Sequence, residues 1–127
     1  MKANFGLISA DEKDDPMSKY MLLYRNPTAA EERQQTPAEM EQVLAQWHAW
    51  KKAHPSILDM GDGLLPTGKR LKAGVVTDGP SVESKELVSG YSIVEAASYD
   101  AAMVVAKACP MNFVPGASIE VRQLAGY

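Results

Sequence analysis

Two ionisable side chains have the type and the setting to act as an acid or a base. Asp78 lies within Thr77-Asp78-Gly79-Pro80 and would place a carboxylate at the end of an expected strand. The same four residues favour a turn, because aspartate before glycine often hydrogen-bonds its own backbone. His48 is the second candidate, since histidine titrates near neutral pH, but a half-buried structural histidine fits its place beside Trp47 better. Both remain candidate catalytic residues.

A charged pair near the C-terminus is the best candidate for holding a ligand. Strand alternation places Glu120 and Arg122 on one face, opposite Ile119 and Val121. The apolar pair should meet the helices, which turns the charged pair toward solvent or a subunit cleft. The guanidinium of Arg122 offers a fixed fork of donors suited to a small organic anion. Glu120 would contact the same ligand or neutralise Arg122, and an ion pair in water is the alternative.

Three further residues are candidate ligand contacts. Trp47 is expected to pack in the core or to frame a pocket wall, and Tyr91 lies in the middle of an expected strand. Lys85, with Glu83 and Glu86, would line a pocket lid or simply a solvated loop, because charge-rich loops normally face water. These assignments depend on where the surrounding elements lie.

The remaining reactive residue types indicate no cofactor and no metal. Cys109 is the only cysteine, so no internal disulfide can form, and its apolar surroundings predict an inert core thiol. His48 and His54 are six residues apart and fall on different helix faces, so they make no metal motif. Neither a phosphate-binding glycine loop nor a GxSxG elbow is present.

Length and charge narrow the classes further. The chain has 127 residues, a net charge of −3, and 13 basic residues that form no cluster, which disfavours nucleic-acid binding. No apolar run approaches the roughly 20 residues that a membrane helix requires, and we expect a cytoplasmic protein. Residues 1–18 read as an N-terminal extension, with an acidic stretch at 10–16, and residues 19–127 as one domain. Phe5, Leu7 and Ile8 are expected to dock on the core or on a partner subunit.

The clearest element is a helix from residue 36 to about residue 54. Thr36 is the expected N-cap, Pro37 occupies the first turn, and Glu39 completes a capping box. Its apolar stripe is Met40, Val43, Leu44, Trp47 and Trp50. A second helix begins after Ser98, has Ala102, Val105, Ala106 and Cys109 on one face, and closes at Pro110.

Strands are expected at 19–24, 56–60, 87–95 and 118–124, with a hairpin of 68–71 and 75–77 around a turn at 72–74. This order is the split β-α-β plan of ferredoxin-like α+β folds with an inserted β-hairpin. It predicts an antiparallel sheet with two helices on one face. The other face carries apolar residues from the two central strands, and pairing two such sheets across a two-fold axis would bury it.

Six motifs stand in the order of a known family: Trp47-His48-Ala49-Trp50, Gly61-Asp62-Gly63-Leu64-Leu65-Pro66, Thr77-Asp78-Gly79-Pro80, Glu83-Ser84-Lys85-Glu86, Gly90-Tyr91 and Ser118-Ile119-Glu120-Val121-Arg122. Together they resemble the DGPF branch of the YCII-related proteins over residues 19–124. The resemblance implies a dimeric α+β barrel with a cleft between the sheets or at their ends. Two features depart from the family: Ser81 replaces its namesake phenylalanine, and no histidine begins the first helix, so the family's proposed His–Asp pair is not carried over.

Two functions of different classes remain open. The first is a dimeric module that binds a small molecule or serves an accessory or regulatory role. The alternative is a cofactor-free enzyme, isomerase- or hydrolase-like, that acts on a small organic acid or lactone with Asp78 or His48 as base. A carboxylate and a histidine converging in one cleft would favour the enzyme, whereas an apolar cleft with a single charged group would favour binding.

Overall fold

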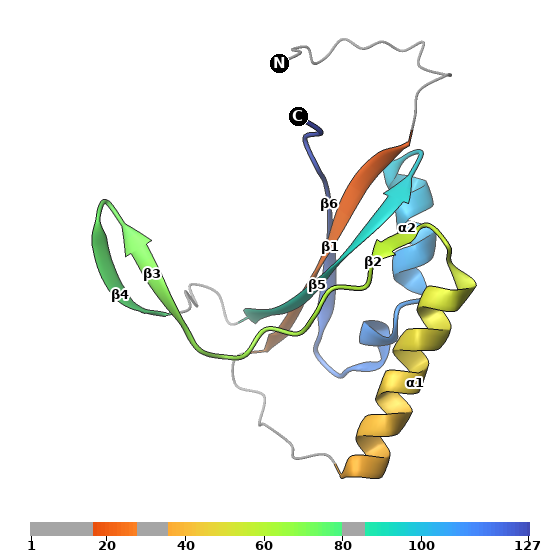
Figure 1. The fold of residues 1–127 in the computed structure, drawn as a ribbon, viewed down its shortest axis with the longest axis horizontal. Coiled ribbons are helices and arrows are strands. Elements are labelled where there is room, and N and C mark those ends of the chain that lie inside the picture. The colour runs from red at the N-terminus through yellow and green to blue at the C-terminus, as the bar shows by residue number, and fades with distance from the viewer. Residues whose placement is uncertain (1–16, 28–35, 80–85) are drawn as a thin grey trace.

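Strands and helices follow one another in the order expected for a ferredoxin-like fold with an inserted hairpin. The computed structural model describes residues 17–27, 36–79 and 86–127. Its main antiparallel sheet has the strand order β2-β5-β1-β6, formed by β1 (Ser18–Pro27), β2 (Ile57–Asp59), β5 (Glu86–Ala96) and β6 (Ser118–Gln123). Helices α1 (Pro37–Ala53) and α2 (Tyr99–Lys107) lie on one side of this sheet (Figure 1). The predicted fold class is confirmed.

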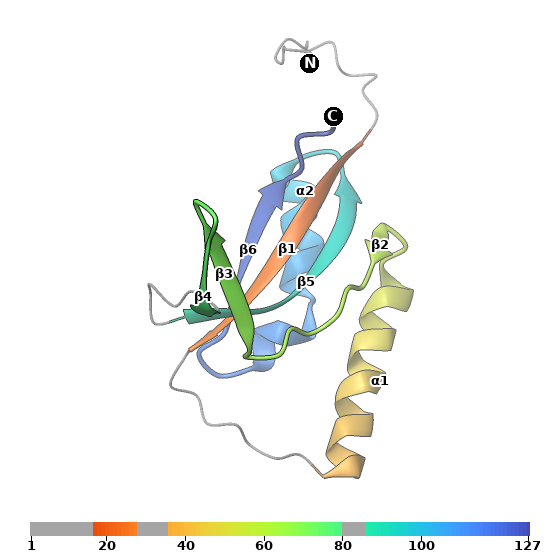
Figure 2. The same ribbon diagram turned by 60° about the vertical axis from the view of Figure 1, so that its left-hand side comes forward.

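The two central strands, β1 and β5, have one buried and one half-buried face. Tyr20, Leu22 and Tyr24 point from β1 toward the helices and are almost fully buried. The alternate residues form the other face, where Met21 pairs with Ile93 and Leu23 with Tyr91, all four half-buried. We call these four residues the open face, because no helix in the described part of the chain covers them (Figure 2).

Helix α1 begins as the sequence predicts but leaves the sheet along its length. Thr36 is the N-cap and forms the full capping box with Glu39, and His54 is the C-cap. Trp50, near the C-terminal end, is buried and its Nε1 donates a hydrogen bond of 3.0 Å to the carbonyl of Val105. Toward the N-terminus the apolar stripe becomes exposed, and Leu44 is 53% exposed. The stripe therefore marks one face correctly, but only its last member enters the core.

Helix α2 is shorter than expected. Ser98 caps it, but the helix ends at Lys107 rather than at Cys109, and a 3-10 helix, η3 (Pro110–Phe113), follows. Cys109 links the two helices and is fully buried as predicted. The early end is consistent with Pro110, which disfavours α conformation at the residue before it.

The inserted hairpin consists of β3 (Gly68–Lys72) and β4 (Val75–Gly79) and forms a separate sheet. Ala73 and Gly74 connect its strands with φ angles of 50° and 81°, the left-handed pair that two-residue hairpin turns require. Every residue from 68 to 78 is exposed. The hairpin projects from the side of the sheet opposite to the helices (Figures 1 and 2).

Some sequence expectations fall outside the described residues. They concern the anchoring of Phe5, Leu7 and Ile8 and the lid residues Glu83 and Lys85; Glu86 starts β5, but its side chain is not described. Within the described residues, no helix combines the length and the apolar character that crossing a membrane requires.

Candidate functional site

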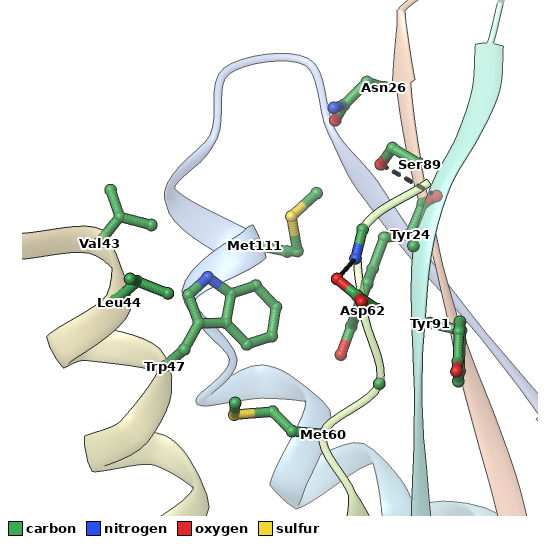
Figure 3. A pocket seen from close by; sticks show the side chains of 13 residues that line it. Tyr24, Asn26, Val43, Leu44, Trp47, Met60, Asp62, Ser89, Tyr91 and Met111 are labelled. Carbon is green, nitrogen blue, oxygen red and sulfur yellow. Dashed lines mark hydrogen bonds between the residues drawn. The ribbon is translucent and has the colours of Figure 1, made fainter. Parts of the chain in front are cut away.

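A cavity of about 550 Å³ lies between α1, the segment after β2 and one end of the sheet (Figure 3). Small-molecule sites usually measure roughly 300–1,000 Å³. We call it the α1 cavity, and its described lining is Tyr24, Asn26, Val43, Leu44, Trp47, Met60, Gly61, Asp62, Gly63, Ser89, Gly90, Tyr91 and Met111. A smaller cavity of about 330 Å³ lies beside the C-terminal half of α1.

The α1 cavity exists because α1 diverges from the sheet. Trp50 holds the C-terminal end of the helix in the core, and Trp47, one turn earlier, is only half-buried. The Trp47 ring meets the rings of both Trp50 and Tyr24 edge-on, with centroids 5.5 Å apart in each pair. Beyond Trp47, Val43 and Leu44 face open space rather than the sheet. The apolar stripe thus becomes a cavity wall.

Glycines allow the segment after β2 to form the opposite wall. A Cβ on Gly61 would lie 1.7 Å from the carbonyl oxygen of Tyr91, and its φ of +75° also favours glycine. A Cβ on Gly90 would lie 3.0 Å from the carbonyl oxygen of Asp62. Backbone therefore packs directly on backbone here, and Gly63 pairs with Gly90 in an isolated β-bridge.

A buried hydrogen-bond chain underlies the cavity. The Tyr24 hydroxyl donates to Ser92 Oγ at 2.6 Å, and Ser92 Oγ donates to the carbonyl of Met60 at 2.7 Å. Cys109 Sγ donates to the Tyr24 oxygen at 3.6 Å. Burial raises the pKa of the Tyr24 phenol and also that of the Cys109 thiol. Both groups therefore stay protonated at neutral pH and act as hydrogen-bonding groups rather than as bases.

Polar groups at the rim of the cavity are a carboxylate, a hydroxyl and an amide, from Asp62, Ser89 and Asn26. Asp62 Oδ1 accepts the backbone N–H of Gly63 at 2.8 Å, and the exposed carboxylate remains at the rim. Ser89 Oγ donates to the carbonyl of Tyr24 at 3.3 Å. Asn26 Oδ1 is buried and accepts no hydrogen bond from the described residues. A ligand with hydrogen-bond donors would complement this rim.

The structure separates the predicted ligand contacts. Trp47 lines the α1 cavity, and Figure 3 shows its ring reaching from α1 toward the sheet. Tyr91 borders the same cavity, but strand alternation turns its ring to the open face, where it pairs with Leu23.

Neither acid–base candidate reaches the α1 cavity. His48 lies exposed on α1 and is absent from the described lining. Asp78 lies near the end of β4, opposite Lys69, and the rest of the expected turn, from Pro80 on, lies outside the described residues. Its side chain is 91% exposed and forms an ion pair of 2.9 Å with Lys69 Nζ. The hairpin reverses at Ala73 and Gly74, within the turn that the sequence predicts at residues 72–74.

The charged pair on β6 faces away from the helices, as strand alternation predicts. Ile119 and Val121 pack against the core, whereas Glu120 and Arg122 pair with the open-face residues Leu23 and Met21. Glu120 bonds to Arg25 at 3.0 Å and lies 3.8 Å from Arg122. Arg122 is 66% exposed on an edge strand and lines neither cavity of the single chain.

Sequence reasoning missed most of the polar lining, namely Tyr24, Asn26, Asp62 and Ser89. One signal was available: Gly61-Asp62-Gly63 places two glycines around a carboxylate, which indicates a close backbone approach. No three His, Cys, Asp or Glu side chains gather into a metal site among the residues with described positions.

The fold and cavity define a ferredoxin-like α+β protein with an aromatic-walled site between its first helix and its sheet. The model of the YCII-related domain family matches residues 17–125, and the chain belongs to this family. No curated protein matches the chain.

Proposed function

We propose that this YCII-related protein binds a small organic molecule in the α1 cavity. The observation that carries the proposal is the half-buried Trp47 ring, which borders a cavity of about 550 Å³ with Val43, Leu44 and Met60. Apolar walls with a few placed polar groups are typical of small-molecule sites. Burying part of an apolar ligand against these walls would supply the driving force.

Binding has more support than catalysis. Asp62 is the single ionisable carboxylate in the described lining, and no histidine accompanies it there. Tyr24 has a raised pKa because it is buried, so it does not supply a phenolate base near neutral pH. The isomerase- or hydrolase-like alternative would therefore need Asp62 to work alone. An apolar cavity with one charged group favours a binding module.

The proposal includes a homodimer formed through the open face. Met21, Leu23, Tyr91 and Ile93 place four large side chains on a sheet surface that the described helices leave bare. The hairpin projects on this same side, where a second copy would lie (Figure 1). Placement in the DGPF branch and a cytoplasmic location also remain proposals, supported by the Thr77–Pro80 motif and by the single, buried cysteine.

Ligand binding can be tested with a matched pair of truncations. A small-metabolite library is screened by thermal shift, and hits are titrated while tryptophan fluorescence is followed. Leu44→Ala should weaken a hit, whereas Leu71→Ala should not, because Leu44 lines the cavity and Leu71 lies on the distant hairpin. Both side chains are exposed, so neither change should move stability by more than about 0.5 kcal/mol. No hit in the library, or equal weakening by both variants, would contradict the proposal.

The dimer can be tested by light scattering at micromolar concentration. Ile93→Asp should yield monomers, because a charge in an apolar interface is strongly unfavourable. Val104→Asp is the control, since Val104 is 64% exposed on α2, away from the open face. A wild-type monomer, or dissociation by the Val104 variant alone, would refute this geometry.

A further inference from the structure

The charge of the described lining of the α1 cavity has one sign. Asp62 is the only charged side chain in its described lining, and no lysine or arginine is among these residues. The cation that the sequence suggested for an anionic ligand, Arg122, lies on the open face. A carboxylate ligand would therefore meet Asp62 without a compensating charge from the described lining.

Several hydrogen-bond donors near the cavity are already engaged. The backbone N–H groups of Gly61 and Gly63 donate to Asp59 Oδ1 and Asp62 Oδ1, each at 2.8 Å. The Tyr24 hydroxyl donates its hydrogen bond to Ser92 Oγ. The indole N–H of Trp47 and the amide of Asn26 remain as neutral donors, so a carboxylate would find a hydrogen bond in the described lining but no cation.

The acceptors, by contrast, have free capacity. Asp62 uses one carboxylate oxygen in its bond to Gly63, and the other accepts no hydrogen bond from the described residues. Asn26 Oδ1 is likewise unpartnered among them, and the terminal torsion of asparagine is broad enough to turn this oxygen toward a ligand. The indole of Trp47 adds an aromatic surface that attracts cations within roughly 6 Å of its ring.

We infer that the α1 cavity takes organic amines that are protonated at neutral pH and carry an apolar body. The ammonium group lies at the rim, where it donates to Asp62 and Asn26, and the body lies against Trp47, Leu44 and Met60. This inference rests on the proposed small-molecule binding and specifies the chemical class of ligand. It replaces the small organic anion that the sequence suggested.

Three probes with one apolar body test the inference: 4-phenylbutylamine, 4-phenylbutan-1-ol and 4-phenylbutyrate. Each is titrated into the full-length protein while tryptophan fluorescence is excited at a wavelength that the probes do not absorb. The amine should bind about two- to fivefold more tightly than the alcohol, the range expected for an exposed charge pair. The carboxylate should bind more weakly than the alcohol, because it meets the like charge of Asp62.

Two isosteric variants assign the effect to one carboxylate. Asp62→Asn keeps the acceptor for the Gly63 N–H and removes the charge, so the amine should lose about two- to fivefold in affinity while the alcohol is unchanged. Asp59→Asn is the matched control, because Asp59 accepts the Gly61 N–H in the same segment but does not line the cavity. It makes the same change in net charge and should leave the affinity for the amine unchanged.

The outcomes separate this inference from the proposed function. Tighter binding of the carboxylate, equal binding of amine and alcohol, or equal effects of the two asparagine variants would overturn the amine inference. Failure of all three probes would overturn it as well. The proposed function would survive any of these results if another library compound bound in a manner sensitive to Leu44→Ala.

Discussion

Replacing Ser92 with alanine should destabilise the protein more than the removal of one hydroxyl group suggests. Ser92 is fully buried, and it is the only polar residue in the buried set of the described chain. Its Oγ accepts a hydrogen bond of 2.6 Å from the Tyr24 hydroxyl and donates one of 2.7 Å to the Met60 carbonyl. The change therefore removes two hydrogen bonds at once.

The expected loss can be worked out from these two bonds. Each contributes about 1 kcal/mol net to folding, and a buried donor or acceptor left unsatisfied costs about 1–3 kcal/mol. Ser92→Ala leaves the Tyr24 hydroxyl without its acceptor and the Met60 carbonyl without this donor. We expect the free energy of unfolding to fall by about 2–4 kcal/mol, with no change in backbone structure.

A double-mutant cycle sharpens the prediction. Tyr24→Phe removes the phenol oxygen but leaves the bond from Ser92 to Met60, and should cost about 1–2 kcal/mol. In the double variant, Tyr24→Phe with Ser92→Ala, no buried tyrosine hydroxyl is left without an acceptor. The combined loss should therefore be smaller than the sum of the single losses by about 1–2 kcal/mol.

Urea unfolding, followed by circular dichroism and by tryptophan fluorescence, measures these losses. The comparison holds if the slope of the unfolding free energy against urea concentration is the same in all variants. Ser89→Ala is the control, because its bond to the Tyr24 carbonyl is longer, at 3.3 Å, and only half-buried. It should cost under about 1 kcal/mol. A Ser92→Ala variant within about 0.5 kcal/mol of the wild type, or additive losses in the cycle, would refute the reasoning.

Two further predictions concern pH and the cavity wall. Burial raises the native pKa of Cys109 above its ordinary 9.0 and that of Tyr24 above 10.0, so the native state binds more protons than the unfolded state at alkaline pH. Stability should therefore hold below about pH 9 and fall above it. In thermal melts between pH 8 and 10, Cys109→Ala should lose less stability than the wild type, since this thiol titrates first. A wild-type stability that does not change over this pH range would contradict the prediction. In urea unfolding, Gly61→Ala should lower the free energy of unfolding more than Gly74→Ala does. Both glycines have positive φ, but only at Gly61 would a Cβ collide with the Tyr91 carbonyl. Equal losses in the two variants would contradict the clash.

Local rules of the sequence predicted the elements and their faces well. The capping box of Thr36 and Glu39 fixed the start of α1, because its hydrogen bonds lie within four residues. Alternation likewise assigned Ile119 and Val121 to the helix side of β6. Both features depend on neighbours along the chain, and both are confirmed.

The site was harder to predict because it depends on how elements separate. The periodicity of α1 identifies a stripe from Met40 to Trp50, but it carries no information on the angle between helix and sheet. Since that angle opens beyond Trp47, Val43 and Leu44 line a cavity instead of the core. Asp78 lies outside the described cavity lining for a related reason: the hairpin that carries it projects from the side of the sheet opposite to α1.

Stability and binding meet in the short segment from Met60 to Gly63. Its first residue gives the core a carbonyl acceptor for Ser92 and gives the α1 cavity an apolar side chain. Its glycines let the backbone lie against β5 where any Cβ on Gly61 would collide. Asp62 is thereby held between two points that are fixed to the sheet, so its carboxylate is positioned by the fold rather than by a ligand. A rim group that is already in place loses little conformational entropy on binding, which favours a rigid recognition site for a small molecule.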